Sequence, residues 1–75
     1  MTFEEILPHL KKGEKIIRKG FSGAEVFIEL VHPDDYQGEK VLPNLLIYVT
    51  GEGYASYLPT VCDLLAEDWL LVAHE

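Results

Sequence analysis

The chain has 75 residues, 48% of them hydrophobic, and a formal net charge of −7 at pH 7. A chain this short forms one domain, and a domain of this size buries only about 60% of the surface that its unfolded form exposes. Affinity for nucleic acids comes largely from Lys and Arg residues that neutralise phosphates, so the acidic composition argues against a nucleic-acid partner. We therefore predict a single domain over residues 1–75 that binds neither DNA nor RNA.

The small core is expected to need additional stabilisation. A core of this size rarely supplies more than about 3–5 kcal/mol. Cys62 is the single cysteine, which excludes an intrachain disulfide, and the sequence has no cluster of Cys and His that suggests a metal site. We therefore predict a homo-oligomer without a cofactor or a metal. The acidic first residues and the lack of about 18 consecutive apolar residues predict a cytoplasmic protein without a membrane partner.

The first predicted element is a helix over residues 3–12. Thr2 and Glu5 have the spacing of a capping box, in which each side chain satisfies an otherwise unpaired amide at the start of the helix. Gly13 offers the left-handed conformation that ends many helices. The apolar spacing of one helical face runs through Phe3, Ile6, Leu7 and Leu10.

Beyond the helix the pattern changes to short runs rich in β-branched and aromatic residues. Residues 32–40 are polar and rich in turn formers, so we predict the longest loop there. Gly51 and Gly53 indicate a hairpin. One helix packed on one face of a small antiparallel sheet of about five strands makes an α+β fold. The predicted strands are residues 15–18, 26–31, 45–49, 54–57 and 69–72.

The segment from Tyr57 to Trp69 combines a proline, a capping-type acid, an apolar pair and an aromatic residue. We predict a strand end, a tight turn or single helical turn near Asp63, and a closing strand from Trp69. Thr60 and Asp63 have two interpretations: they cap this turn, or they contact a ribose hydroxyl of a ligand. Tyr57 either ends a strand or lines a ligand site. Asp68, just before Trp69, is expected in a solvated turn.

The connection between the first two predicted strands contains Gly20, Phe21, Ser22 and Gly23. Its glycines permit positive φ and the close approach of a ligand, and the alternative is an ordinary strand connection with Phe21 packed on the core, which the residues alone favour. Five of the six basic residues lie within residues 1–19. Among them Arg18 is the candidate phosphate ligand, because its planar guanidinium can grip a phosphate through two hydrogen bonds.

Five short segments follow one another in a characteristic order: MTFEEI (1–6), KGEKIIRKG (12–20), VFIEL (26–30), LP (42–43) and LAEDW (65–69). This ordered set, which covers most of the chain, resembles the second type of the Thoeris anti-defense family, small phage and prophage proteins that bind and hide nucleotide immune signals. Members of that family often have tryptophan where this chain has Phe21 and Tyr57.

The resemblance implies a ligand-binding domain that is not an enzyme and that forms a homotetramer of two dimers in the cytoplasm of a bacterial host cell. The implied ligand is a small cyclic nucleotide-type signal, such as a cyclic ADP-ribose isomer. The aromatic residue at position 21 is expected to stack on its base, a contact worth about 1–3 kcal/mol per base in nucleic-acid complexes. The expected ligand-binding residues are Arg18, Phe21, Tyr57, Thr60 and Asp63.

Two other functions fit the sequence. The acidic residues 20–75 are compatible with a protein-interaction inhibitor that mimics DNA. A small hydrolase of the signal would use Cys62 or Asp63, although His9, His32 and His74 are scattered along the sequence and form no recognisable catalytic constellation.

Overall fold

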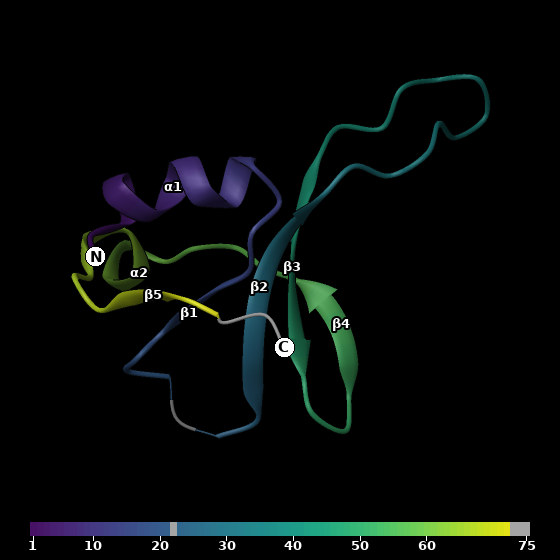
Figure 1. Cartoon of the computed structure of the whole chain (residues 1–75). Helices are drawn as coiled ribbons and strands as arrows, with labels where there is room; N and C mark the ends of the chain where they lie inside the picture. Colours follow the sequence, from purple (N-terminus) through teal and green to yellow (C-terminus); the bar gives the residue numbers. More distant parts are fainter. Residues whose placement is uncertain (22, 73–75) are drawn as a thin grey trace.

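The computed structural model describes residues 1–21 and 23–72 (Figure 1). Ser22 of the glycine-rich connection and His74 lie outside the described residues. Five strands form one antiparallel sheet in the order β4-β3-β2-β1-β5. The predicted α+β fold is confirmed, and the turn near Asp63 is a second short helix. In chain order the elements are α1 (Phe3–Lys11), β1 (Ile16–Arg18), β2 (Glu25–Val31), β3 (Asn44–Val49), β4 (Gly53–Ser56), α2 (Val61–Leu65) and β5 (Trp69–Leu71).

Helix α1 begins and ends as its sequence predicts. The Thr2 N–H donates to Glu5 Oε1 at 2.9 Å, and the Glu5 N–H donates to Thr2 Oγ1 at 3.2 Å, so both halves of the capping box are formed. At the other end Gly13 has φ +90°. Its N–H donates to the Leu10 carbonyl and the next N–H donates to the His9 carbonyl, the paired bonds of a Schellman motif.

Both helices lie on the side of the sheet formed by β2, β1 and β5 (Figure 1). The core lies between these helices and these strands. Each of its five fully buried side chains is 1% exposed or less. Trp69, the largest of them, is anchored at two backbone groups of other segments: its N–H donates to the Met1 carbonyl and its indole Nε1 donates to the Asp63 carbonyl at 2.9 Å. The buried residues are Ile6, Leu10, Ile16, Ile28 and Trp69.

Strands β2, β3 and β4 extend away from the helices, and the loop after β2 projects farther still (Figure 1). Residues 50–52 close the predicted hairpin between β3 and β4, with Gly51 at φ +85°. One face of these strands carries an aromatic cluster made of Phe27, Tyr48 and Tyr54. The first two rings stack with centroids 5.4 Å apart, and the two tyrosine rings are 5.0 Å apart. This part of the sheet is therefore held by cross-strand ring contacts.

The strand limits differ slightly from the prediction. Tyr57 follows the end of β4, although its N–H still donates to the Leu45 carbonyl at 2.9 Å. Lys15 and Val72 lie just outside β1 and β5, and the Val72 N–H donates to the Lys15 carbonyl. Such differences of one residue are ordinary at strand ends, where pairing is incomplete.

Candidate functional site

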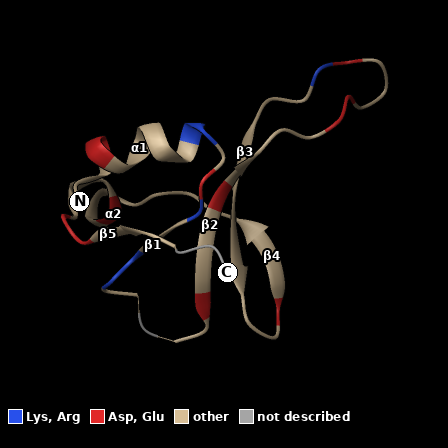
Figure 2. Cartoon of the chain, in the orientation of Figure 1, with Lys and Arg blue, Asp and Glu red and all other residues tan. Residues whose placement is uncertain are grey.

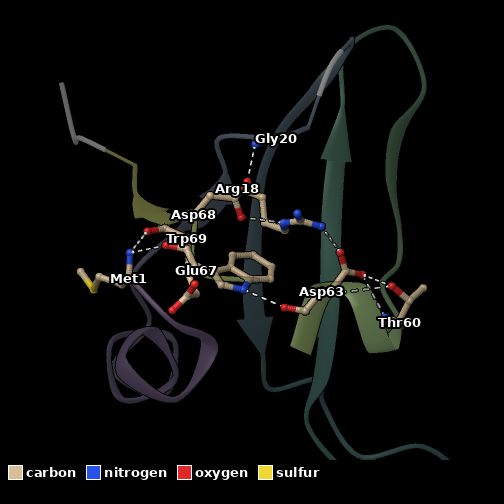
Figure 3. Close-up of polar contacts among 8 residues, drawn as sticks. All are labelled: Met1, Arg18, Gly20, Thr60, Asp63, Glu67, Asp68 and Trp69. Atoms are coloured by element: carbon tan, nitrogen blue, oxygen red, sulfur yellow. Dashed lines mark hydrogen bonds and ion pairs between the residues drawn. The ribbon is translucent and has the colours of Figure 1, made fainter. Parts of the chain in front are cut away.

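Arg18 is the last residue of β1 and lies opposite Trp69 of β5 in the register of the two strands. Its Nε donates to Asp68 Oδ1 at 2.9 Å, and its Nη1 donates to Asp63 Oδ1 at 2.9 Å. Figure 3 shows the guanidinium between these two carboxylates, next to the Trp69 indole. The hydrogen bonds that Arg18 donates to Asp68 and then to Asp63 raise the pKa of Arg18. Two carboxylates face one guanidinium, so this network has a net negative charge.

Asp63 is held at the start of α2. Its Oδ2 accepts from the Thr60 N–H at 2.9 Å, and its own N–H donates to Thr60 Oγ1 at 3.3 Å, which completes a second capping box. Asp63 is only 7% exposed. Burial alone would raise the pKa of Asp63, but the Thr60 N–H, the Tyr57 hydroxyl and the Arg18 guanidinium that face its carboxylate outweigh burial and hold the pKa below its ordinary value. The capping interpretation of Thr60 and Asp63 is thus confirmed.

Asp68 is the residue of this network that the sequence did not single out. Its Oδ2 accepts from the Gly20 N–H at 2.7 Å, and its carbonyl accepts from the Lys19 N–H at 2.9 Å, in addition to the Arg18 contact. The bond with Arg18, and then the Gly20 N–H, lower the pKa of Asp68. The expected solvated turn is therefore a half-buried clamp between β5 and the chain that follows β1. The signal in the sequence was an acidic residue directly before Trp69, the residue that pairs with Arg18 in the sheet.

Phe21 is half-buried and belongs in part to the core. Its ring meets the Trp69 ring edge to face with centroids 6.1 Å apart, and the Arg18 guanidinium carbon lies 5.5 Å from its centroid. Its N–H donates to the Arg18 carbonyl. Packing of Phe21 on the core is therefore established, and the residue remains partly exposed.

Tyr57 also lies beside this network. Its hydroxyl is buried and makes no hydrogen bond of good geometry among the described residues, although it lies close enough to the Asp63 carboxylate for each group to shift the pKa of the other. Burial raises the pKa of this hydroxyl well above its ordinary value, and the nearby Asp63 carboxylate raises it further. The Tyr57 hydroxyl is thus enclosed beside Asp63, and the charged groups that act on its pKa are those of Asp63 and Arg18.

The structure thus gathers all five predicted residues in one neighbourhood. Arg18, Thr60 and Asp63 share hydrogen bonds, Phe21 contacts Arg18, and Tyr57 lies near Asp63. The hydrogen-bonded residues of this neighbourhood, referred to below as the Arg18 network, are Arg18, Gly20, Thr60, Asp63 and Asp68.

Candidate catalytic and metal-binding groups do not gather in the same way. Cys62 is exposed on α2, and His9 Nδ1 is engaged with Glu14 Oε2 at 2.7 Å. Within residues 1–21 and 23–72, no group of three or more His, Cys, Asp or Glu residues is placed to hold a metal ion, and no pocket is formed. None of the helices in this part of the chain has the length and apolarity needed to cross a membrane.

Comparison with known proteins finds the same family that the ordered sequence segments resemble. A sequence model of the Thoeris anti-defense 2-like domain matches residues 1–72. The chain belongs to this family. It is 31% identical over 85 aligned positions to Thoeris anti-defense 2 of Bacillus phage SP01, an alignment that spans 97% of this chain and 96% of the phage protein. The resemblance inferred from the sequence is therefore confirmed over residues 1–72, nearly the whole of this chain.

Proposed function

We propose that this member of the Thoeris anti-defense 2-like family is a phage or prophage anti-defense protein that binds and sequesters a cyclic nucleotide-type immune signal. The signal is a cyclic ADP-ribose isomer or a related cyclic nucleotide, and it is not cleaved. Family membership supports the anti-defense role. The observation that carries the binding role is the convergence of two partly exposed aromatic residues, Phe21 and Tyr57, on the Arg18 guanidinium.

In this proposal, affinity comes mainly from stacking and directed hydrogen bonds. Phe21 stacks on a base, and Tyr57 stacks on a second base. Arg18 already uses Nε and Nη1 for carboxylates, so it meets a phosphate through Nη2, which has no hydrogen-bond partner among the described residues. Thr60 and Asp63 contact a ribose hydroxyl at the edge of the capping box.

The ligand pocket is proposed to be completed by a second copy of the chain. Large apolar side chains lie exposed directly beside Thr60 and Asp63: Leu58 is 84% exposed, Val61 70% and Leu65 76%. Contact between copies would cover such groups, in a tetramer made of two dimers. Light scattering at micromolar concentration is expected to show the tetramer, and a monomer of 8.5 kDa would contradict this assembly.

Binding without cleavage is supported by the state of the acidic groups. Asp63 Oδ1 accepts from Arg18 and Oδ2 accepts from Thr60, so both oxygens of its carboxylate already help to hold the start of α2. Asp68 is engaged in the same way by Arg18 and Gly20. Acids that are already paired and have lowered pKa values are poor general bases or acids near neutral pH.

Acidic residues are spread over the molecule in a pattern that does not favour a DNA mimic. Figure 2 shows them at the start of α1, at both ends of β2, in the β3–β4 hairpin, in the long loop and before β5. A DNA mimic needs a continuous run of negative charge that reproduces a phosphate backbone. Two of the acids here are also paired with Arg18.

A retention experiment tests the proposal against its alternatives. The protein is incubated with cyclic ADP-ribose isomers and cyclic dinucleotides, separated from free nucleotide and then heat-denatured. Release of the intact nucleotide is expected. A changed product would show a hydrolase, and no retention of any probe would favour a protein partner. Protein that is heat-denatured before incubation controls for nonspecific retention.

A further inference from the structure

We infer that Asp68 is a positioning residue whose carboxylate fixes the turn that presents Phe21 to the ligand. The role of Phe21 in binding rests on the proposed function, whereas the effect of Asp68 on the turn is a property of the free protein. Asp68 itself lies at the start of the closing strand, directly before the buried Trp69.

Three bonds join Asp68 to the chain that leads into Phe21. Oδ1 accepts from Arg18 Nε at 2.9 Å, the carbonyl accepts from the Lys19 N–H at 2.9 Å, and Oδ2 accepts from the Gly20 N–H at 2.7 Å. The two side-chain bonds involve an ionised acceptor and are of the stronger, charge-assisted kind. One carboxylate therefore ties both the guanidinium and the backbone of this segment to β5.

The space at Gly20 agrees with this tie. A Cβ atom built on Gly20 would lie 2.7 Å from Asp68 Oδ2, closer than real Cβ contacts. The sequence predicts that the glycines of this connection let a ligand come close, whereas in the structure the group that approaches Gly20 is the Asp68 carboxylate. Glycine here lets the carboxylate reach the amide, and any side chain would push the two apart.

Phe21 is the next residue, and its position depends on the same atoms. Its ring lies against Trp69 and under the Arg18 guanidinium, and its N–H donates to the Arg18 carbonyl. Loss of the Asp68 charge removes the strong acceptor from both Arg18 Nε and the Gly20 N–H. The guanidinium and the turn are then free to shift, and the exposed part of the ring no longer has one fixed direction.

The first test reads the turn without any ligand. In Asp68→Asn, the amide retains an oxygen but not the charge, so we expect an upfield shift of the Gly20 amide proton and a change in the fluorescence of Trp69, the single tryptophan. Glu67→Gln is the matched control, because Glu67 is the exposed neighbouring acid and its side chain makes no hydrogen bond among the described residues. An Asp68→Asn spectrum that differs from wild type no more than the control spectrum would overturn the inference.

The second test asks whether Asp68 acts through Phe21. Calorimetry uses the cyclic ADP-ribose isomer or cyclic dinucleotide that wild type binds most tightly. Asp68→Asn is expected to weaken binding about tenfold, consistent with the loss of a hydrogen bond to a charged group. Asp68→Glu keeps the charge but moves it, so its affinity should be closer to that of Asp68→Asn than to that of wild type. In the Phe21→Ala background the same change should cost less than about twofold, since residues that act as a unit are not additive.

The outcomes separate the two proposals. Equal losses from Asp68→Asn in the wild-type and Phe21→Ala backgrounds would show that Asp68 does not act through Phe21, and would overturn the positioning role while leaving ligand binding established. If wild type binds none of the probes, the proposed function fails, and the Gly20 amide shift still decides whether Asp68 fixes the turn.

Discussion

The two sides of the sheet are held by different kinds of interaction. Near β1 and β5, the Arg18 guanidinium is held between the Asp63 and Asp68 carboxylates, next to the fully buried Trp69. On the β2-β3-β4 side, the aromatic cluster is held by ring contacts between neighbouring strands, and Lys15 Nζ lies 4.3 Å from the Phe27 ring centroid. Directed polar bonds specify one geometry, whereas ring contacts tolerate small shifts. The first arrangement suits a site in which side chains must keep their direction.

The largest expected effect comes from Trp69→Ala. Removing a fully buried aromatic side chain costs about 3–5 kcal/mol, and the Asp63 carbonyl also loses its indole donor. Tyr54→Ala, in the exposed part of the aromatic cluster, should cost less than about 1 kcal/mol because a cross-strand pair contributes no more than that. Urea unfolding followed by circular dichroism compares the two free energies of unfolding. Similar costs for both variants would show that the two sides of the sheet contribute alike.

Phe21→Ala is expected to weaken binding of the nucleotide signal by about 1–3 kcal/mol, the value of one stacked base, while the oligomer persists. Phe21→Trp should tighten binding, because the larger ring offers more stacking area. Tyr54→Ala is the control from the aromatic cluster and should leave the affinity unchanged. Calorimetry with the tightest of the cyclic nucleotides gives the comparison. An unchanged affinity for Phe21→Ala would show that this ring does not stack on the ligand.

Arg18→Gln should weaken ligand binding more than Lys40→Gln. Arg18 lies within the network, with a side chain that is 21% exposed, and its loss also leaves two carboxylates facing each other. Lys40 lies in the long loop after β2. Because a short-ranged contact is only partly screened, binding should tolerate or gain from moderate salt. Equal losses for both variants, or an affinity that collapses between low and physiological salt, would indicate diffuse attraction by basic residues instead.

The smallest expected effect is a pH dependence of stability. The folded protein lowers the pKa of Asp63 and Asp68 below the ordinary value of 3.8, so the unfolded chain binds protons more readily in acid. Their contribution to the free energy of unfolding is present above this value and is lost as the pH falls below it through the lowered pKa. Urea unfolding between pH 5 and pH 2 measures the slope, and Asp68→Asn should reduce it. An unchanged slope would contradict the assignment to this network.

Features that depend on neighbouring residues were predictable from the sequence. The capping box of Thr2 and Glu5 and the hairpin at Gly51 follow from residues a few positions apart, and each is formed as expected. The turn near Asp63 was also expected, with capping by Thr60 as one of two interpretations. Short runs rich in β-branched and aromatic residues predicted the limits of all five strands to within about one residue. Local steric and hydrogen-bonding preferences suffice for these predictions.

The pairing around Arg18 could not be derived in this way. Asp63 and Asp68 lie 45 and 50 positions further along the chain, and the sequence offers other acids as equally good partners. The choice follows from the sheet order, because β5 pairs with β1 and places Trp69 opposite Arg18. Asp68 then adjoins the guanidinium, and α2 packs so that Asp63 reaches it from the other side. An ion pair depends on distance in space, which for residues this far apart is set by strand order and helix packing.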